Sequence, residues 1–262
     1  MPNKTVTDFE ELLKVTGRKP IPSDLAMYRT PSGIPGFDDL VEGGFEKGSV
    51  ILVVGIPGSG KTIFALQFLH NGAANFQEPG LFITFAESKE SIYRHALSFG
   101  WDFAELEKKK MFQLLQFKPH QVTGLIEEGG GAIKDEIRSM GAKRLVIDSI
   151  TAYSMLFKDE YQQREGIVSF IERLHEWECT SMIISEMPPM VSETREGSIG
   201  FLSDAIIALH YSKPQKSLSR IHSLEILKMR GTRHSTRLCA LSFENDGLVV
   251  HADEFLNAVS ER

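Results

Sequence analysis

The chain has 262 residues, of which 42% are hydrophobic and 24% charged, an ordinary balance for a globular protein with one large domain. No apolar run approaches the roughly 18 to 20 residues of a membrane helix, and the start of the chain lacks the apolar core of a signal peptide, so we expect a cytoplasmic protein without membrane association. The net charge of −6 argues against a dedicated nucleic-acid binder. Cys179 and Cys239 lie in apolar surroundings without a CxxC pattern, which argues against a disulfide or metal framework.

Residues 1–24 mix Thr, Lys, Glu and Pro around one short helical candidate, and we treat them as an N-terminal arm. No linker divides the remainder, so residues 25–262 are predicted to form a single domain. After a turn-rich stretch, the unbroken apolar run Val50–Val54 predicts a buried strand. A helix is predicted from Thr62 to Asn71, ending at Gly72.

Short apolar runs then alternate with helical periods. The predicted strands are Leu81–Phe85, Met111–Phe117, Leu145–Ser149 and Ser181–Ser185, and the predicted helices are Lys89–Phe99, Ala132–Met140 and Glu160–Trp177. This order predicts an α/β fold with a mostly parallel sheet flanked by helices. Beyond residue 200 the pattern contains strand-like runs without a helix: Ala205–Tyr211, Ser223–Met229, Leu238–Phe243 and Leu248–His251. We expect them to add antiparallel strands to the same sheet.

The segment Gly55–Thr62, which spells GIPGSGKT, fits the phosphate-binding pattern G-x-x-x-x-G-K-[ST] at every fixed position. In such a P-loop, glycines let backbone N–H groups converge on phosphate oxygens, Lys61 reaches the β- and γ-phosphates, and the Thr62 hydroxyl binds Mg²⁺. The loop also lies between a predicted strand and a helix N-terminus, where the helix dipole favours an anion. The sequence therefore predicts a nucleotide site at this loop.

Two carboxylates follow neighbouring predicted strands. Asp148 ends an apolar strand, the arrangement that holds Mg²⁺ beside a P-loop, so Thr62 and Asp148 are the predicted metal residues. Hydrolysis also needs a group that orients and deprotonates water, and Glu87 is the only acid at the end of the strand Leu81–Phe85. Glu87 could equally be an ordinary acidic residue at a helix N-terminus.

The basic residues are unevenly distributed. Between Lys213 and Arg237 there are seven Lys or Arg and one acid, Glu225, whereas the rest of the chain carries 22 basic and 34 acidic residues. A cationic strip on an acidic body is expected to face a local anion.

Many ordered segments resemble the RecA superfamily and, within it, the KaiC-like ATPases. The matching segments are Gly36–Leu40 with Gly43 and Gly44, the P-loop, Gln67–Leu69 with Asn71 and Gly72, Glu78–Phe85, Ser98–Asp102, Val146–Ser149, Phe201–Asp204, and Leu227–Thr232 with His234. The resemblance covers almost the whole chain after the arm and corresponds to one KaiC-type domain.

The resemblance implies a RecA-like core that assembles into a ring, usually of six subunits, with ATP and Mg²⁺ between neighbours and a nucleotide-dependent regulatory or signalling role toward an unknown protein partner. The candidate catalytic residues are therefore Lys61, Glu87, Lys228 and Arg230, and the resemblance implies that the last two reach the neighbouring subunit's phosphates. The implied nucleotide-binding residues are Pro57, Gly58, Ser59, Gly60, Lys61, Thr62, Ile63, Ser98, Lys228, Arg230, Thr232 and His234.

One position departs from the family pattern. The KaiC-like family that the sequence resembles usually has two adjacent acids after the strand that ends in Phe85, and the first of them is the family's catalytic glutamate position. Here that residue is Ala86, and only Glu87 is acidic. Neighbouring strand residues point to opposite faces, so Glu87 replaces the missing group only if the strand has already turned into the loop. We therefore expect ATP binding with weak hydrolysis.

Two alternatives stay open. One is a RecA- or RadA-paralogue-like DNA-binding protein of recombination or repair, with Lys213, Lys216 and Arg220 as the basic contact. Against it, the long polar loop after Glu186 holds Arg195 as its only basic residue, beside Glu193 and Glu196. The other alternative is a non-hydrolysing scaffold in which ATP joins subunits, consistent with Ala86.

Overall fold

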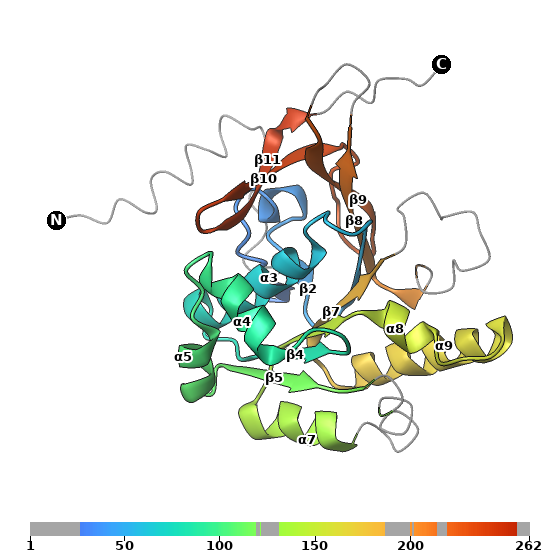
Figure 1. Cartoon of the computed structure of the whole chain (residues 1–262). Helices are drawn as coiled ribbons and strands as arrows, with labels where there is room; N and C mark the ends of the chain where they lie inside the picture. Colours follow the sequence, from blue (N-terminus) through green and yellow to red (C-terminus); the bar gives the residue numbers. More distant parts are fainter. Residues whose placement is uncertain are drawn as a thin grey trace.

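The computed structural model describes residues 27–118, 121, 131–186, 200, 202–213 and 219–255. The predicted arm, residues 1–24, lies outside this part of the chain, as do Lys216 and the basic and acidic residues of the polar loop after Glu186. Figure 1 shows a central twisted sheet with helices on both of its faces.

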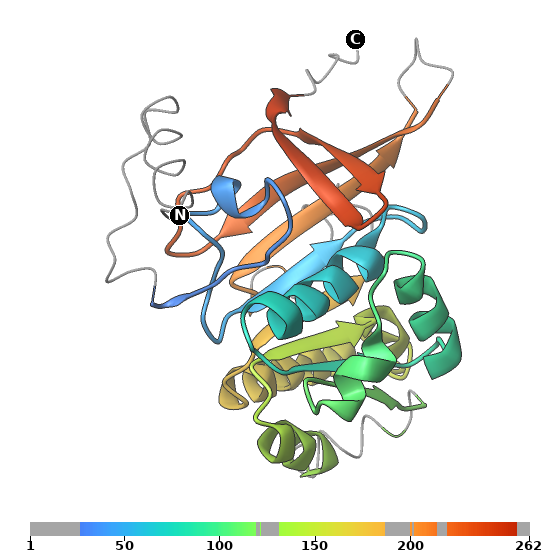
Figure 2. The same ribbon diagram turned by 90° about the vertical axis from the view of Figure 1, so that its left-hand side faces the viewer.

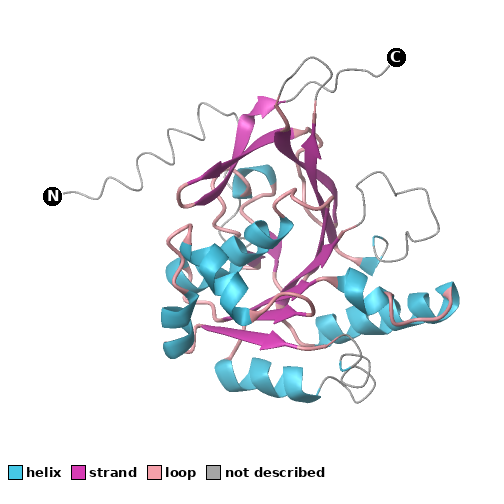
Figure 3. Cartoon of the chain, in the orientation of Figure 1, coloured by secondary structure: helices cyan, strands magenta, loops and turns pink. Residues whose placement is uncertain are grey.

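The central sheet has nine strands in the order β11-β10-β9-β8-β3-β7-β6-β4-β5. They are β3 (Val50–Val54), β4 (Gly80–Thr84), β5 (Phe112–Gln116), β6 (Arg144–Asp148), β7 (Thr180–Ser185), β8 (Ala205–Ser212), β9 (Ile221–Met229), β10 (Cys239–Glu244) and β11 (Gly247–Phe255). The strands from β8 to β5 are parallel, whereas β9, β10 and β11 extend the edge beyond β8 in antiparallel pairing. The predicted fold class, a mostly parallel sheet with antiparallel C-terminal strands, is confirmed (Figure 3). A separate short ribbon pairs β1 (Arg29–Thr30) with β2 (Phe45–Glu46).

Helices cover the two faces of the sheet in two groups, as Figure 2 shows from the side. Their bounds are α3 (Lys61–Asn75), α4 (Lys89–Leu97), α5 (Phe103–Lys108), α7 (Gly131–Met140), α8 (Ile150–Ser154) and α9 (Glu160–Glu176), with a 3-10 turn, η1, over Asp38–Leu40. Apolar side chains of α3, α4 and α5 share one buried cluster with the C-terminal strands, whereas those of α7, α8 and α9 share the other. All five residues of β3 are buried, as a strand covered on both faces requires.

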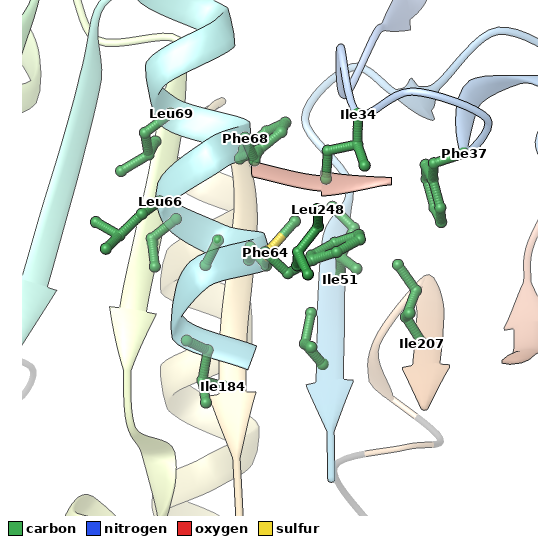
Figure 4. Packing of buried hydrophobic residues seen from close by; sticks show 14 of the residues in the cluster. Ile34, Phe37, Ile51, Phe64, Leu66, Phe68, Leu69, Ile184, Ile207 and Leu248 are labelled. Atoms are coloured by element: carbon green, nitrogen blue, oxygen red, sulfur yellow. The ribbon is translucent and has the colours of Figure 1, made fainter. Parts of the chain in front are cut away.

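The first cluster is built around α3, whose Phe64 and Phe68 are fully buried. Figure 4 shows these rings between Ile34 and Phe37 of the segment before β2 and the labelled strand residues of the sheet. Edge-to-face contacts join Phe37 to Phe64, with ring centroids 5.5 Å apart, and Phe45 to Phe68, 5.9 Å apart. The turn-rich N-terminal segment is therefore part of the core, and it helps to fix the helix that follows the P-loop.

One predicted helix boundary is wrong, and two short helices were not predicted. Helix α3 does not end at Gly72 but continues to Asn75. Gly72 serves packing instead, because a Cβ there would lie 2.4 Å from the Arg144 side chain. The short helices α5 and α8, of six and five residues, were not predicted from the sequence. Their lengths give too few turns for a periodic pattern.

Cys179 and Cys239 are both buried, and both are free thiols. Burial raises the pKa of the Cys179 thiol to about 11. Across the described part of the chain, no helix combines the length and apolar character needed to cross a membrane.

Candidate functional site

The P-loop connects the end of β3 to the first turn of α3. Gly58 and Gly60 adopt φ values of 83° and 99°, a left-handed conformation that favours glycine. Gly60 is also the N-cap of α3, so the predicted binding segment from Pro57 to Ile63 consists of the loop and the start of the helix. The orphan N–H groups of that helix end point toward the loop, which is the arrangement that binds phosphate.

Lys61 is buried, with 7% of its surface exposed, and its Nζ donates a hydrogen bond of 3.0 Å to the carbonyl oxygen of Ile56. Burial lowers the pKa of the Lys61 ammonium, while the nearby carboxylates of Glu186 and Asp148 act in the opposite direction. The P-loop lysine thus lies among acids that end neighbouring strands, β7 and β6.

The structure brings Thr62 and Asp148, the two predicted metal residues, into contact. Thr62 Oγ1 donates a hydrogen bond of 2.7 Å to Asp148 Oδ2. Burial raises the pKa of Asp148 to about 6, the Thr62 bond opposes this, and Glu87 is a further like charge that raises it. A hydroxyl and a carboxylate oxygen at a phosphate loop fit Mg²⁺, which takes oxygen ligands and commonly shares them with substrate phosphates. These two residues are therefore suited to hold the ion together with a nucleotide.

Glu87 lies in a turn and no longer in the strand. β4 ends at Thr84, and the Thr84 hydroxyl accepts hydrogen bonds from the backbone N–H groups of Ala86 and Glu87 at 3.4 and 3.2 Å. The Glu87 carboxylate accepts a hydrogen bond from Ser91, 3.4 Å away, and lies 3.6 Å from His95 Nδ1 on α4. The chain has therefore left the strand before Glu87, which is the condition for Glu87 to replace the acid that is missing at position 86. The Glu87 carboxylate, however, contacts α4.

An aromatic group that the sequence did not reveal packs against the P-loop. His222 Nε2 donates a hydrogen bond of 3.1 Å to the Gly58 carbonyl oxygen, and the His222 ring stacks on Tyr211 with centroids 4.2 Å apart. Phe243 lies beside Gly60, where an added Cβ would be 2.8 Å from the ring. These residues come from β8, β9 and β10, so the antiparallel strands support the loop. The spacing of these residues along the sequence does not indicate that they meet at the P-loop. Phe243 lies in a predicted strand, and His222 directly precedes one.

Lys228 and Arg230 lie at the opposite end of the sheet from the P-loop of their own chain. Lys228 pairs with Ile206 near the beginning of β8, and the backbone N–H of Arg230 donates to the Asp204 carbonyl, which directly precedes β8. Asp204 in turn contacts Val50, the first residue of β3, whereas the P-loop follows the last. The five residues of β3 separate the two ends by about 13 Å. The structure does not bring the predicted finger residues to the P-loop within one subunit.

Thr232 and His234 follow Arg230 in a loop that is attached to the N-terminal segment. Arg29 Nη1 donates a hydrogen bond of 2.6 Å to Thr232 Oγ1, and Arg29 also pairs with Glu42 at 3.3 Å. His234 Nδ1 lies 3.2 Å from the Thr232 carbonyl oxygen. The same loop is therefore held in place by contacts that the sequence pattern did not predict.

Ser98 ends α4, where its hydroxyl donates to the His95 carbonyl at 2.6 Å. Three residues later, Trp101 Nε1 donates to the Asp246 carbonyl in the turn between β10 and β11, 3.1 Å away. Since Phe243 of the same hairpin contacts Gly60, the Ser98 corner is linked to the P-loop through this hairpin.

Of the basic residues considered for nucleic acid, Arg220 packs over the Tyr211 ring, 5.1 Å from its centroid.

Comparisons with known proteins agree with this arrangement. The family model described as "ATPase: KaiC" matches residues 30–254. The chain is 37% identical over 239 residues to a circadian clock oscillator protein KaiC from Prochlorococcus marinus subsp. pastoris, covering 87% of this chain and 46% of that protein. The chain thus spans about half the length of the curated KaiC proteins that it matches.

Other relatives match along nearly their whole length. The UPF0273 protein PH0284 of Pyrococcus horikoshii is 33% identical over 245 residues, which cover 87% of this chain and 96% of that protein. The crystal structure of the KaiC-like protein PH0186 from Pyrococcus horikoshii OT3 superposes with a TM-score of 0.75 at 35% identity, covering 85% of this chain and 98% of the other. With the P-loop, the Asp148 strand and the sheet order in place, the chain belongs to the KaiC family of P-loop ATPases and has their RecA-like core.

Proposed function

We propose that this protein binds ATP with Mg²⁺ at the P-loop and hydrolyses it at the interface between two copies of the chain, in a ring that we expect to contain six subunits. The domain that does this spans residues 25–262, preceded by the arm over residues 1–24. Lys61 and the backbone from Pro57 to Ile63 bind the phosphates, and Thr62 with Asp148 binds the metal ion.

The observation that supports this most is the separation of Lys228 and Arg230 from their own P-loop. Arginine fingers stabilise the charge that develops on the transferred phosphoryl group, so they act only where they can reach it. About 13 Å of β3 lies between the two ends of the sheet, and side chains held at the start of β8 do not cross it. A second subunit is therefore the natural source of Lys228 and Arg230. Ser98, Thr232 and His234 complete the nucleotide environment.

The charge distribution supports the same arrangement. The chain has a net charge of −6, yet the region from Lys213 to Arg237 is strongly cationic. A neighbour's ATP, with its several negative charges, is a local anion that such a strip can meet across an interface. Binding of ATP would then strengthen the ring, and loss of the γ-phosphate would weaken it.

We infer that the protein serves as a nucleotide-dependent regulatory switch toward a protein partner and that its hydrolysis is weak. Because residue 86 is an alanine, the position beside Asp148 has no carboxylate. The nearby carboxylate of Glu87 contacts α4. General base groups typically contribute about 10²- to 10⁴-fold to a rate. A long-lived ATP state suits a switch whose partner recognises one assembled form.

The test is steady-state ATP turnover with Mg²⁺ as a function of protein concentration, on protein whose oligomeric mass is measured in parallel. Lys61→Ala serves as the blank and Arg230→Ala removes the finger. We expect turnover per subunit to rise with concentration as rings form, and both variants to fall to background while Arg230→Ala still binds ATP. Turnover that is independent of concentration and unaffected by Arg230→Ala would contradict an interface enzyme. ATP binding without turnover above the blank would instead indicate a nucleotide-gated scaffold.

A further inference from the structure

The two finger residues are held by one short segment just before β8. Lys228 Nζ donates hydrogen bonds of 2.8 and 2.7 Å to the carbonyl oxygens of Gly200 and Ser203. Arg230 Nη1 lies 3.4 Å from Oδ1 of Asp204, the next residue of the same segment. The ammonium is therefore fixed by backbone carbonyls and the guanidinium by a carboxylate.

Asp204 also connects this segment to the strand that carries the P-loop. Its Oδ2 accepts a hydrogen bond of 2.9 Å from the backbone N–H of Val50, the first residue of β3. The two backbones are joined as well, since Asp204 N–H donates to the Val50 carbonyl and Arg230 N–H donates to the Asp204 carbonyl, both at 2.8 Å. His175 of α9 is a further neighbour, with Nε2 3.7 Å from Oδ2. Asp204 is thus fixed from several sides and can hold another group in one place.

We propose that Asp204 is the positioning residue of the arginine finger, holding Arg230 ready for the nucleotide of the adjoining subunit; this rests on the interface arrangement proposed above. Asp204 divides its carboxylate between two tasks. Oδ2 is anchored to the rigid start of β3, and Oδ1 faces the guanidinium.

The charges explain why a carboxylate is needed there. Lys228 and Arg230 are close enough that Arg230 helps to lower the pKa of the Lys228 ammonium, after burial, while Asp204 opposes this. Two cations that must converge on one phosphate repel each other before it arrives, and a carboxylate between β3 and Arg230 offsets this repulsion. The Arg230 side chain is half exposed, so without Asp204 it would lose more rotamer freedom on reaching the phosphate.

A purely structural role for Asp204 is the competing explanation, because the Val50 bond alone would hold the start of β8 against β3. Asp204→Asn separates the two roles. The amide oxygen still accepts from the Val50 N–H, whereas the amide NH₂ that replaces Oδ1 presents a donor to Arg230. Glu225→Gln is a matched control, since it converts another carboxylate of the region, paired with His210 at 3.2 Å, into an amide.

The experiment uses mixed rings. Arg230→Ala subunits keep an intact P-loop, and Lys61→Ala subunits keep intact finger residues, so only an interface between the two kinds is complete. Asp204→Asn is placed either in the Lys61→Ala subunit, which donates the finger, or in the Arg230→Ala subunit, which donates the P-loop. The readout is kcat and KM for ATP in each mixture, with Glu225→Gln placed in the same two ways.

We expect Asp204→Asn in the finger-donating subunit to lower kcat about 10- to 100-fold with KM for ATP little changed, because a displaced group loses transition-state stabilisation. The same substitution in the P-loop-donating subunit should have no such effect, and Glu225→Gln should have none in either. An equal loss in both subunits, or no loss, would overturn the positioning role. If the mixture without Asp204→Asn is itself inactive, the interface arrangement falls, and the positioning role falls with it.

Discussion

Thr62 Oγ1 donates a hydrogen bond of 2.7 Å to Asp148 Oδ2, which joins the residue after the P-loop lysine to a carboxylate 86 positions later. The carboxylate is partly buried, and this burial raises its pKa to about 6. The two oxygen groups that we propose as metal ligands therefore already contact each other, and one of them holds a proton more readily than an ordinary aspartate.

This pKa predicts how stability of the metal-free, nucleotide-free protein depends on pH. The folded chain binds a proton at Asp148 more tightly than the unfolded chain, whose pKa is near the usual 3.8, so protonation favours folding. The contribution to the free energy of unfolding grows as pH falls through about 6 and is lost as pH rises through it. Between pH 8 and pH 5 we expect wild type to gain about 1 kcal/mol relative to Asp148→Asn.

Urea unfolding of both proteins at pH 5, 6, 7 and 8, with EDTA present, measures this difference. Comparing the two proteins cancels the titration of all other groups. Parallel stability curves for wild type and Asp148→Asn over this range would contradict the raised pKa.

Arg144 lies outside the proposed nucleotide site, and its contacts predict an effect on stability. Its side chain is fully buried and donates to Glu78 at 2.7 Å and to the carbonyl oxygens of Phe68 and Pro31 at 2.7 and 2.8 Å. Truncation leaves buried acceptors and a carboxylate without their donor, so Arg144→Ala should cost about 3–5 kcal/mol in chemical denaturation. Arg173→Ala is the control, because its pairing with Glu176 is largely exposed and should contribute less than about 1 kcal/mol. Similar losses for the two variants would contradict this account.

Gly36 tests the contact between the N-terminal segment and β11. Gly36 has a φ of 76°, and a Cβ there would lie 1.8 Å from the Val250 carbonyl oxygen, whereas Gly48 has a φ of 75° with nothing within 4 Å of a Cβ. Both alanine variants incur the left-handed backbone cost of about 1–2 kcal/mol. Gly36→Ala must also displace a backbone, so we expect its melting temperature to fall well below that of Gly48→Ala. Equal melting temperatures would mean that the approach of Val250 is not constrained.

The sequence was sufficient for the parts of this molecule that depend on local pattern. Buried parallel strands give continuous apolar runs such as Val50–Val54, and the P-loop motif occupies fixed positions, so sheet, loop and Asp148 were predicted. The family resemblance supplied Lys228 and Arg230, but only the structure shows that they lie at the far end of the sheet from the P-loop.

Other features depend on contacts between distant residues, which no local pattern encodes. The bond from Arg29 to Thr232 spans 203 positions, and that from His222 to Gly58 spans 164. Gly72 was misinterpreted for the same reason, since its need for a small side chain comes from Arg144 of β6 rather than from a helix end.

Ala86 gives the prediction that concerns catalysis most directly. It is exposed and lies beside Asp148, because the backbone N–H of the preceding residue, Phe85, donates to the Asp148 carbonyl at 3.1 Å. Ala86→Glu should therefore add a carboxylate next to the metal and phosphate residues and raise kcat for ATP about tenfold or more, because a water would gain a general base.

Ala86→Gln is the matched control, since it has the same shape without basicity and should raise kcat less. Steady-state turnover at saturating ATP, measured on variants of equal oligomeric mass, decides the matter. If wild type already matches Ala86→Glu while Glu87→Gln abolishes its turnover, then Glu87 leaves its contacts with Ser91 and His95 when ATP binds and is itself the base.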